Sequence, residues 1–292
     1  MRFKVVLAAA LAGTIACGGR GKGSPTEPGP TPQPNSNISY TAIGASDAIG
    51  YGSSNVCIPF AGCPDGRGYI QVATRELRAR GFTVDLTNLG FPAHVLSRRL
   101  QDLGTRYGRL MTGNMLELQA PFVTAGTTLV TIFTGANDVD TIVAALGGGA
   151  GGSDEASQIA YIDSQIDAFA QDFAALLNTV RDRAPSARVV VLNLPNMAGI
   201  PRDINASLQK RRAQQMLSVG ITTKVINPKA SSGVLVVDLM CDSRSYQTSS
   251  YSVDGFHPSD AGYAWIAAEV VAAATTAYRP PASSCSQTVL VQ

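Results

Sequence analysis

Asp254 and His257 are the residues of this chain best spaced for proton transfer. They lie three positions apart in the segment Asp-Gly-Phe-His-Pro, so a turn there brings the carboxylate to one imidazole nitrogen. Such a bond fixes the tautomer of the ring and stabilises the imidazolium ion. An oriented imidazole can take the proton of a serine hydroxyl, which is otherwise a poor nucleophile. The pair therefore predicts a general base, His257, that is held by an acid, Asp254.

A nucleophile and its supporting donors are available in three other short segments: Gly-Ala-Ser-Asp at 44–47, Asn-Leu-Gly at 88–90 and Gly-Ala-Asn-Asp at 135–138. Ser46 supplies a hydroxyl group in a turn that contains glycine. The tetrahedral intermediate of acyl transfer needs hydrogen-bond donors for its oxyanion. The backbone N–H groups of Ser46 and Gly90 and the side-chain amide of Asn137 could provide them. Together these residue types predict acyl transfer with Ser46 as the nucleophile.

The elements that must position these residues alternate between short apolar runs and longer helical patterns. The expected strands are 38–43, 83–89, 127–133, 187–194 and 233–239. The expected helices are 68–80, 95–106, 156–183, 205–225 and 258–278. Within 156–183 the apolar residues recur every three or four positions, which is typical of one buried helical face. Residues 189–192 are apolar throughout, as expected for a strand that is covered on both faces.

Strands separated by helices predict a parallel sheet joined by right-handed crossovers. We expect one domain over residues 38–292 with a three-layer α/β/α architecture. In such sheets, ligands bind beyond the carboxyl ends of the strands. Three of the polar segments lie at the ends of expected strands, and the segment that carries His257 lies downstream of the fifth strand. The topology therefore brings all four segments to one edge of the sheet.

In this order, the four segments resemble the four sequence blocks of the SGNH (GDSL-type) hydrolases. The four letters correspond to Ser46, Gly90, Asn137 and His257, and the last two segments match the family pattern closely. The resemblance covers the chain from about residue 38 to 278. It implies a flavodoxin-like, five-stranded parallel sheet of order 2-1-3-4-5 and a Ser-His-Asp triad. It also implies hydrolysis of carboxylic esters with neither a metal nor a cofactor.

The first of the four blocks departs from the family pattern. Gly-Asp-Ser-Leu is usual there, whereas this chain has Ala45 before the serine and Asp47 after it. The segment is also not the Gly-x-Ser-x-Gly elbow of α/β-hydrolases, because Ala48 stands at the last glycine position. We assign Asp47 no catalytic role and expect it to bond nearby backbone groups or to line the pocket.

Other residues compete for the roles of base and acid. His94 is a rival base, but no acid precedes it by three positions, and we interpret it as a loop or substrate-pocket residue. Asp238 and Asp242 are alternative acids that lack the spacing to a histidine. We expect Asp138 to position its loop through structural hydrogen bonds. The glycine-rich stretch 146–153 lacks the Lys-Ser/Thr of a phosphate-binding loop, and we expect a surface loop near the site.

The N-terminus has the pattern of an export signal. Residues 1–16 start with a basic segment, continue with a short apolar run and end in small residues, too short to span a membrane. Cys17 resembles the lipid acceptor of a bacterial lipobox, although Thr14 stands where that pattern usually has Leu. Residues 17–37 are rich in Gly and Pro, which predicts a tether. We expect a protein of the bacterial cell envelope, either anchored to the membrane by a lipid on Cys17 or secreted after ordinary cleavage.

Four cysteines remain once the lipidation site is set aside, an even number in an oxidising compartment. Of the three possible pairings we favour Cys57 with Cys63, which closes a local loop, and Cys241 with Cys285, which ties down the C-terminal tail. We expect the local loop and the glycine-rich stretch to shape an acyl pocket. The chain has two histidines and no CxxC spacing, so we expect no metal site.

Charge and composition narrow the range of partners. The formal net charge is +2, and loss of Arg2 and Lys4 with the leader leaves zero, which provides no basic field for nucleic acid. Hydrophobic residues make up 45% of the chain, enough for a sizeable core. We expect a monomer whose partner is an ester substrate, either a lipid or a small acyl ester.

Two other functions fit the same residues. A carbohydrate O-deacetylase of the same fold would use the same catalytic set on acetylated sugars. A non-catalytic surface lipoprotein could bind glycan with an inherited hydrolase fold, but a pure binder has no need of an acid three residues before a histidine. The Pro-containing loop 193–196 after the fourth strand resembles the lipase and esterase members of the family. We therefore favour a lipid or small acyl ester over a sugar ester.

Overall fold

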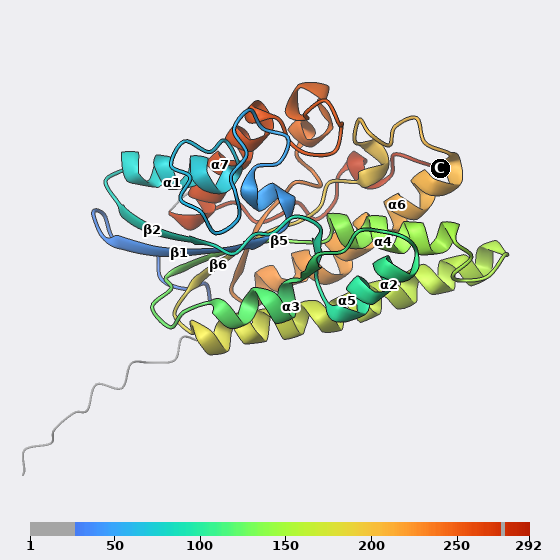
Figure 1. Cartoon of the computed structure of the whole chain (residues 1–292), viewed down its shortest axis with the longest axis horizontal. Coiled ribbons are helices and arrows are strands. Elements are labelled where there is room, and N and C mark those ends of the chain that lie inside the picture. The colour runs from blue at the N-terminus through green and yellow to red at the C-terminus, as the bar shows by residue number, and fades with distance from the viewer. Residues whose placement is uncertain (1–26, 276–277) are drawn as a thin grey trace, which may run out of the picture.

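The computed structural model describes residues 27–275 and 278–292, and a five-stranded parallel sheet forms its centre. The strands are β1 (Asn37–Gly44), β2 (Thr83–Asn88), β5 (Leu129–Phe133), β6 (Arg188–Leu192) and β7 (Val234–Val237). They lie in the order β2-β1-β5-β6-β7 (Figure 1). Counted along the chain, this is the 2-1-3-4-5 order implied by the family resemblance, so the predicted fold class is confirmed.

Helices cover both faces of the sheet and complete the three layers (Figure 1). One face carries two helices that pack on each other, α1 (Tyr69–Ala79) and α7 (Asp260–Ala274). The opposite side carries α2 (Arg98–Arg106), α3 (Met115–Leu118), α4 (Ala136–Gly147), α5 (Glu155–Arg183) and α6 (Leu208–Gly220). Ser46 and Gly90 follow β1 and β2, Asn137 lies in the first turn of α4, and Asp254 and His257 lie in the loop before α7.

The core lies between the sheet and its helices. Every residue of β5, β6 and β7 is buried. Helix α5 closes one side with apolar residues at three- and four-residue steps: Ile162, Ile166, Phe169, Phe173 and Leu176 are all buried. Burial of one such side chain contributes roughly 1.5–3 kcal/mol. The helical periodicity predicted for this segment is confirmed.

Helix α4 is not predicted by the sequence pattern. Its N-cap, Gly135, has a φ of +114°, a backbone conformation that favours glycine. The N–H of Gly135 donates to Asp138 Oδ2 at 3.1 Å, which fixes the first turn. The buried apolar residues Val139, Ile142 and Ala145 give only a short periodic signal. The clearest local feature of this helix is therefore its N-terminus, where Gly135 and Asp138 fix the first turn.

Two expected helices have different bounds in the structure. The helix expected from residue 95 begins at Arg98, because β3 (His94–Val95) pairs with β4 (Gly113–Asn114) in a short parallel ribbon. Helix α6 ends at Gly220 and continues as a π-helical segment, Ile221–Ile226. The helical run ends in a 3-10 turn that contains Pro228, which has no backbone N–H to donate.

The described part of the expected tether lies against the domain. The guanidinium group of Arg188 donates to the carbonyl oxygen of Gly29 at 2.9 Å, and the N–H of Thr83 donates to that of Ser36 at 3.2 Å. Residues 27–37, the described part of the predicted tether, therefore make contacts with the domain at Gly29 and Ser36. The predicted signal segment 1–16 and Cys17 lie outside the described residues.

Both expected disulfides are present in the structure. Cys57 pairs with Cys63 in a local loop, and Cys241 pairs with Cys285 at the start of the C-terminal tail. Beyond this bond the tail packs on α6. The side chain of Gln215 accepts from Leu290 N–H and donates to the carbonyl oxygen of Val291, both at 2.7 Å. The tail is thus held by a covalent bond at one end and by α6 at the other.

Candidate active site

Ser46, His257 and Asp254 lie in contact beyond the carboxyl end of β1. Ser46 is the first residue of a 3-10 helix, Ser46–Ile49, that follows the strand. Its Oγ lies 2.9 Å from His257 Nε2, and His257 Nδ1 lies 2.6 Å from Asp254 Oδ2. The backbone N–H of His257 also donates to Asp254 Oδ1 at 2.9 Å, which closes the turn between them. The three side chains have the geometry of a nucleophile, a base and an orienting acid.

Asp254 is surrounded by hydrogen-bond donors. Besides the two groups of His257, the Ser252 hydroxyl and the Phe256 N–H donate to it, both at 2.8 Å. Partial burial opposes ionisation, but these hydrogen bonds outweigh it and hold the pKa of Asp254 at about 2. The group is therefore a carboxylate at neutral pH, as an acid that orients an imidazole must be.

The ring of His257 is held between two aromatic side chains. Its centroid lies 4.7 Å from that of Tyr51 and 4.8 Å from that of Phe256. Gly52 permits this close approach: its φ is +90°, and a Cβ there would lie 2.7 Å from the Cβ of His257. The sequence does not identify Tyr51 or Gly52 as site residues, because their role depends on a contact with a loop near the other end of the chain.

Two of the three candidate oxyanion donors are engaged in hydrogen bonds within the protein. Ser46 opens a helix, so its N–H has no partner within that helix. The N–H of Gly90 donates to Asn88 Oδ1, and the amide of Asn137 donates to the carbonyl oxygen of His94, both at 3.0 Å. A primary amide has two N–H donors, so one remains on Asn137 for a ligand. A ligand oxyanion would have to take the Gly90 N–H from Asn88.

Gly90 and Asn88 also join β2 to the nucleophile turn. The amide of Asn88 donates to the carbonyl oxygen of Ala48 at 2.7 Å. A Cβ on Gly90 would overlap the Cβ of Ala48. The glycine is therefore required by a close approach of two segments, in addition to any role as an oxyanion donor.

His94 lies in the β3–β4 ribbon, and its hydrogen bonds serve the structure. Its Nδ1 accepts from the amide of Gln119 at 2.7 Å, and the residue is only 5% exposed. Burial lowers the pKa of His94 to about 4, so the ring is neutral at pH 7. The same Gln119 side chain donates to the carbonyl oxygen of Gly44 and accepts from its N–H, both at 2.9 Å. No sequence motif points to Gln119, which clamps the end of the nucleophile strand.

Two acids next to the candidate residues are buried or half-buried. Asp47 lines a small cavity of about 50 Å³ behind the triad, together with Phe133 and Tyr251, and burial raises its pKa. Asp138 is fully buried and accepts from the N–H of Leu96 at 2.8 Å, besides its bond to the start of α4. Burial raises the pKa of Asp138 to about 6. Its contacts are those expected of a residue that positions the loop.

The alternative acids lie elsewhere. Asp238 accepts from the amide of Asn193 at 3.0 Å, and Asp242 pairs with the guanidinium group of Arg244 at 2.6 Å. Neither is bonded to a histidine. Within residues 27–275 and 278–292, no three His, Cys, Asp or Glu side chains cluster as a metal site requires.

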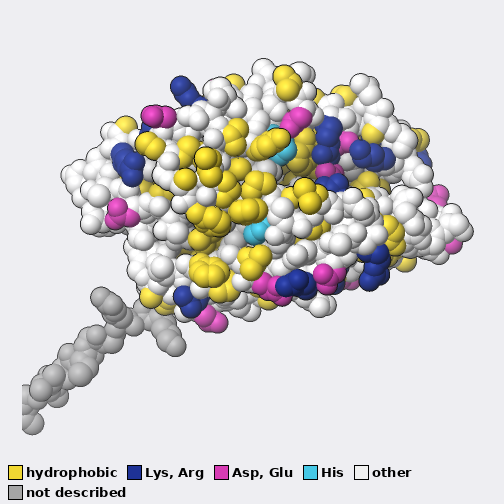
Figure 2. Space-filling view, viewed as in Figure 1, with side chains coloured by type: hydrophobic (Ala, Val, Ile, Leu, Met, Phe, Trp, Pro, Cys, Tyr) yellow, Lys and Arg dark blue, Asp and Glu magenta, His cyan; other side chains and the backbone are white. Residues whose placement is uncertain are grey.

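Apolar side chains surround the mouth of the site. Figure 2 shows them gathered near the two histidines. The Cys57–Cys63 loop contributes Ile58 and Phe60, which are 75% and 73% exposed. The Phe60 ring stacks on that of Phe91 at 5.9 Å, and the Phe91 ring lies 5.2 Å from that of His94. The disulfide loop therefore adds apolar surface on the side of the candidate oxyanion donors.

Comparisons with known proteins identify the family and the fold of this chain. The family model of the GDSL-like lipase/acylhydrolases matches residues 42–265, a span that includes all four polar segments. A search of curated proteins found no match.

Several solved structures share the fold. A lipase from a goat rumen metagenome is 16% identical, with a TM-score of 0.54 over 81% of this chain and 97% of its own. An extracellular lipase from Streptomyces rimosus is 17% identical, with a TM-score of 0.51 over 82% of this chain and 100% of its own. A lipase/acylhydrolase from Enterococcus faecalis is 16% identical, with a TM-score of 0.50 over 83% of this chain and 98% of its own. At these identities the likeness shows the fold alone.

Proposed function

The chain belongs to the GDSL-like lipase/acylhydrolase family, and we propose that it hydrolyses carboxylic esters with Ser46, His257 and Asp254 as its catalytic triad. The observation that carries the proposal is the continuous contact from Ser46 Oγ through the imidazole to Asp254. A binding protein gains nothing from a hydroxyl, a base and an ionised acid in this order. The geometry therefore favours catalysis over simple glycan binding.

The reaction proceeds through an acyl-enzyme. Ser46 Oγ attacks the ester carbonyl carbon while His257 Nε2 takes the hydroxyl proton, and Asp254 stabilises the imidazolium ion. Donors on Ser46, Gly90 and Asn137 hold the negative oxygen of the tetrahedral intermediate. The C–O bond to the alcohol breaks, and the alcohol leaves with the proton from His257. Water then attacks the acyl-enzyme by the same route, which releases the carboxylic acid and restores Ser46.

Covalent labelling tests the nucleophile. The wild-type protein is incubated with a fluorophosphonate probe, and hydrolysis of p-nitrophenyl butyrate is measured in parallel. Ser46→Ala should lose both signals, whereas Ser249→Ala, at an exposed serine of a nearby loop, should keep both. A folded wild-type protein that neither labels nor turns over the ester contradicts the proposal, as does labelling that survives Ser46→Ala.

The two disulfides indicate that the protein folds in an oxidising compartment outside the cytosol. Among the described residues, no helix has both the length and the apolar character needed to cross a bilayer. Our proposal for membrane attachment is a lipid on Cys17, supported by the lipobox-like sequence before it. Membrane fractionation in a bacterial host tests it. Wild-type protein should sediment with membranes and Cys17→Ser should not; equal release of both contradicts a lipid anchor.

A further inference from the structure

Exposed apolar side chains gather on the face of the molecule that Figure 2 shows. Ile58 and Phe60 lie in the loop closed by the first disulfide, and Leu118 and Phe122 lie at and just beyond the end of α3; all four are exposed. Phe60 and Phe122 are the two exposed phenylalanines of the described residues. We call these four side chains, together with the half-buried Phe91, the apolar stripe. Clusters of this kind mark surfaces that bind a partner or a membrane, and the proposed reaction gives the stripe no role.

The apolar stripe is continuous past the candidate oxyanion donors. The ring of Phe60 stacks on that of Phe91, and the Phe91 ring lies next to that of His94. Leu118 continues the stripe beyond His94, because a Cβ on Gly113 would lie 2.6 Å from both Leu118 Cδ1 and His94 Nε2. The contacts therefore run from the disulfide loop to α3 without a break.

The disulfide loop is built to hold its aromatic side chain outward. Phe60 has a φ of +63°, a left-handed backbone conformation that is costly for a bulky residue. The N–H of Cys57 donates to the carbonyl oxygen of Ile49 at 2.9 Å, which joins the loop to the 3-10 helix of the nucleophile. The guanidinium group of Arg75 donates to the carbonyl oxygen of Pro64 at 2.7 Å. Because the loop is fixed on both sides, it presents a rigid apolar surface.

The other end of the apolar stripe adjoins the place where the described tether meets the domain. The carbonyl oxygen of Val123, the residue after Phe122, accepts from the guanidinium group of Arg183 at 2.8 Å. Arg183 is the last residue of α5. Four residues later, Ala187 contacts Gly29: a Cβ on Gly29 would lie 2.5 Å from the carbonyl oxygen of Ala187. The tether therefore reaches the domain beside the end of α5 that contacts the stripe.

The length of the chain before this contact favours a bilayer as the occupant of the stripe. Ten residues lead from Cys17 to Glu27, and a chain of that length spans at most about 35 Å. A lipid on Cys17 would thus keep the neighbouring end of the stripe close to the membrane. Such attachment makes docking intramolecular, so a modest apolar surface is enough to hold the orientation.

The charged groups beside Leu118 favour apolar contact over attraction to lipid headgroups. Arg98 and Glu117 form an exposed ion pair at 2.9 Å, so each neutralises the other. The mature chain that we expect has no net charge. Docking would therefore depend on the apolar area that the bilayer removes from water.

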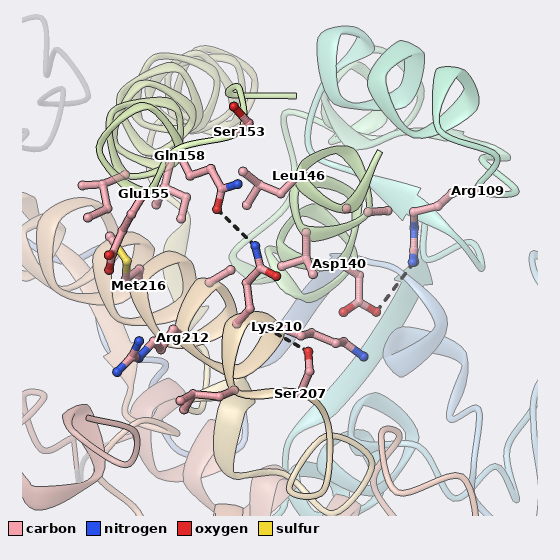
Figure 3. A pocket seen from close by; sticks show the side chains of 18 of the residues that line it. Arg109, Asp140, Leu146, Ser153, Glu155, Gln158, Ser207, Lys210, Arg212 and Met216 are labelled. Atoms are coloured by element: carbon pink, nitrogen blue, oxygen red, sulfur yellow. Dashed lines mark hydrogen bonds and ion pairs between the residues drawn. The ribbon is translucent and has the colours of Figure 1, made fainter. Parts of the chain in front are cut away.

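A cavity between α4, α5 and α6 differs from the stripe in both place and character. Its volume is about 980 Å³, and Figure 3 shows the side chains that line it. Leu146 of the glycine-rich stretch lines it, as do charged side chains such as Arg109 and Asp140, but neither the triad nor a candidate oxyanion donor does. Leu208, at the start of α6, also lines it and is exposed. Because α6 and α3 lie well apart, Leu208 is an apolar control position outside the stripe (Figure 1).

We propose that the apolar stripe docks on the bilayer that holds the lipid of Cys17, so that the mouth of the active site faces this membrane. The choice of the bilayer rests on the lipid anchor proposed above, whereas docking itself needs no catalysis by Ser46. In this orientation, esters presented at the membrane surface reach the site directly.

Vesicle sedimentation tests the stripe separately from the anchor and from the reaction. The protein carries Cys17→Ser and Ser46→Ala, with an unrelated cleavable export leader in place of residues 1–16. It is mixed with vesicles of phosphatidylethanolamine and phosphatidylglycerol, and the bound fraction is measured against lipid concentration. The protein should sediment with the vesicles at millimolar lipid. Absence of binding under these conditions overturns the proposal.

Substitutions at the two ends of the stripe provide the matched comparison in this assay. The stripe variants are Ile58→Ser/Phe60→Asn and Leu118→Ser/Phe122→Ser, and the control is Ile204→Ser/Leu208→Ser, at exposed aliphatic positions elsewhere. Asparagine tolerates the left-handed conformation at position 60. Each stripe variant should bind the vesicles about tenfold or more weakly, because two apolar side chains no longer leave water. The control should bind as its parent does, and equal affinity of all three folded variants overturns the proposal.

Fluorescence quenching tests the orientation of the anchored protein. Phe60→Trp, Phe122→Trp and Leu208→Trp are introduced separately into the lipid-anchored chain, which is reconstituted in vesicles that contain brominated lipid. The native Trp265 is common to all three proteins. The added emission should fall about twofold or more at positions 60 and 122 and change little at position 208. Equal quenching at the three positions, or quenching at position 208 alone, overturns the proposal.

Neither assay uses ester turnover, so failure of the proposed reaction would leave both results unchanged. Sedimentation equilibrium without lipid distinguishes the bilayer from a second copy of the chain as the occupant. A monomer is expected. A dimer that Ile58→Ser/Phe60→Asn dissociates, together with no quenching at position 60, would assign the stripe to a second copy and overturn the proposal.

Discussion

The two histidines of this protein, His257 in the loop before α7 and His94 in the β3–β4 ribbon, have opposite environments. His257 is bonded to an ionised acid on one side and to Ser46 on the other. His94 is nearly fully buried and accepts a hydrogen bond from the neutral amide of Gln119. The ring of His257 thus contacts an acid and a hydroxyl group, whereas burial keeps the ring of His94 neutral.

The difference teaches that the partner of the histidine sets its role. A carboxylate stabilises the imidazolium ion that forms when a base takes a proton. An amide donor to Nδ1 requires a lone pair there, so it stabilises the neutral ring. Gln119 uses the same amide to clamp Gly44, two residues before the nucleophile. The His94 region therefore supports the end of β1, and the His257 region has the contacts expected of the proposed catalytic base.

Exchange of each histidine should give the largest contrast. His257→Asn removes the proposed base and should lower kcat/KM by roughly 10⁴-fold or more. His94→Asn keeps a polar side chain and should lower it by less than about tenfold, because the ring touches no reacting group. The measurement is p-nitrophenyl butyrate hydrolysis by proteins whose folding is checked by circular dichroism. Equal losses in the two variants would break the contrast.

The oxyanion donors should give the next largest effect. Asn137→Ala removes a proposed oxyanion donor and should lower kcat by about 10²–10³-fold with a smaller change in KM. Its other hydrogen bond, to the carbonyl oxygen of His94, is structural, so the unfolding midpoint in urea is measured as well. If the variant loses stability but keeps its kcat, the role of Asn137 is structural and it is not an oxyanion donor.

Loss of the clamp should reduce stability. Gln119→Leu leaves the N–H of Gly44 and the Nδ1 of His94 without their partner, and it should lower the free energy of unfolding by about 3 kcal/mol. Gln247→Leu, at an exposed loop position, serves as the control and should change it by less than about 0.5 kcal/mol. Urea denaturation at pH 7 measures both. A Gln119 variant as stable as the control would show that the clamp contributes little.

The smallest effect concerns pH. His94 has a pKa of about 4 in the folded protein and about 6.5 when unfolded, so the unfolded chain takes up the proton first as the pH falls. Its contribution to stability is complete above pH 6.5 and is lost toward pH 4. Between pH 7 and pH 5, wild-type protein should lose about 2 kcal/mol more stability than His94→Gln.

Asp138 acts in the opposite direction in the same range. Its pKa of about 6 in the folded state means that folding favours its protonated form as the pH falls. Because Asp138 is present in both proteins, its contribution cancels in the difference between them. The free energy of unfolding of both proteins is measured by urea denaturation at pH 7 and at pH 5. An equal loss of stability in wild-type protein and His94→Gln would contradict the neutral, buried state of His94.

The sequence predicts the sheet and the main catalytic candidates because both depend on local patterns. Apolar runs mark the strands, and the three-residue spacing of Asp254 and His257 is enough to place them in one turn. The order of the strands comes from the family resemblance, which the topology confirms. The family resemblance includes Gly90 as a candidate oxyanion donor, but the sequence does not predict its close approach to Ala48.

The remaining features depend on contacts between distant segments. Gln119 bonds Gly44, and Tyr51 packs on His257, but neither pair has a spacing that a motif can record. Helix α4 begins after Gly135, and glycine is equally typical of a loop, so the sequence pattern does not reveal this helix. The cavity between α4, α5 and α6 arises from the separation of these helices. That separation depends on packing and has no signal in a single sequence.

The bond between Cys241 and Cys285 has a practical consequence for production of the protein. In a reducing bacterial cytoplasm this bond would not form, and the tail that it starts would rely on hydrogen bonds to α6 alone. Helix α6 lies apart from the triad, which is held by other segments. Protein made in that compartment would then have a more loosely attached C-terminal tail. Export to the periplasm allows the bond to form and the tail to be fixed at both ends.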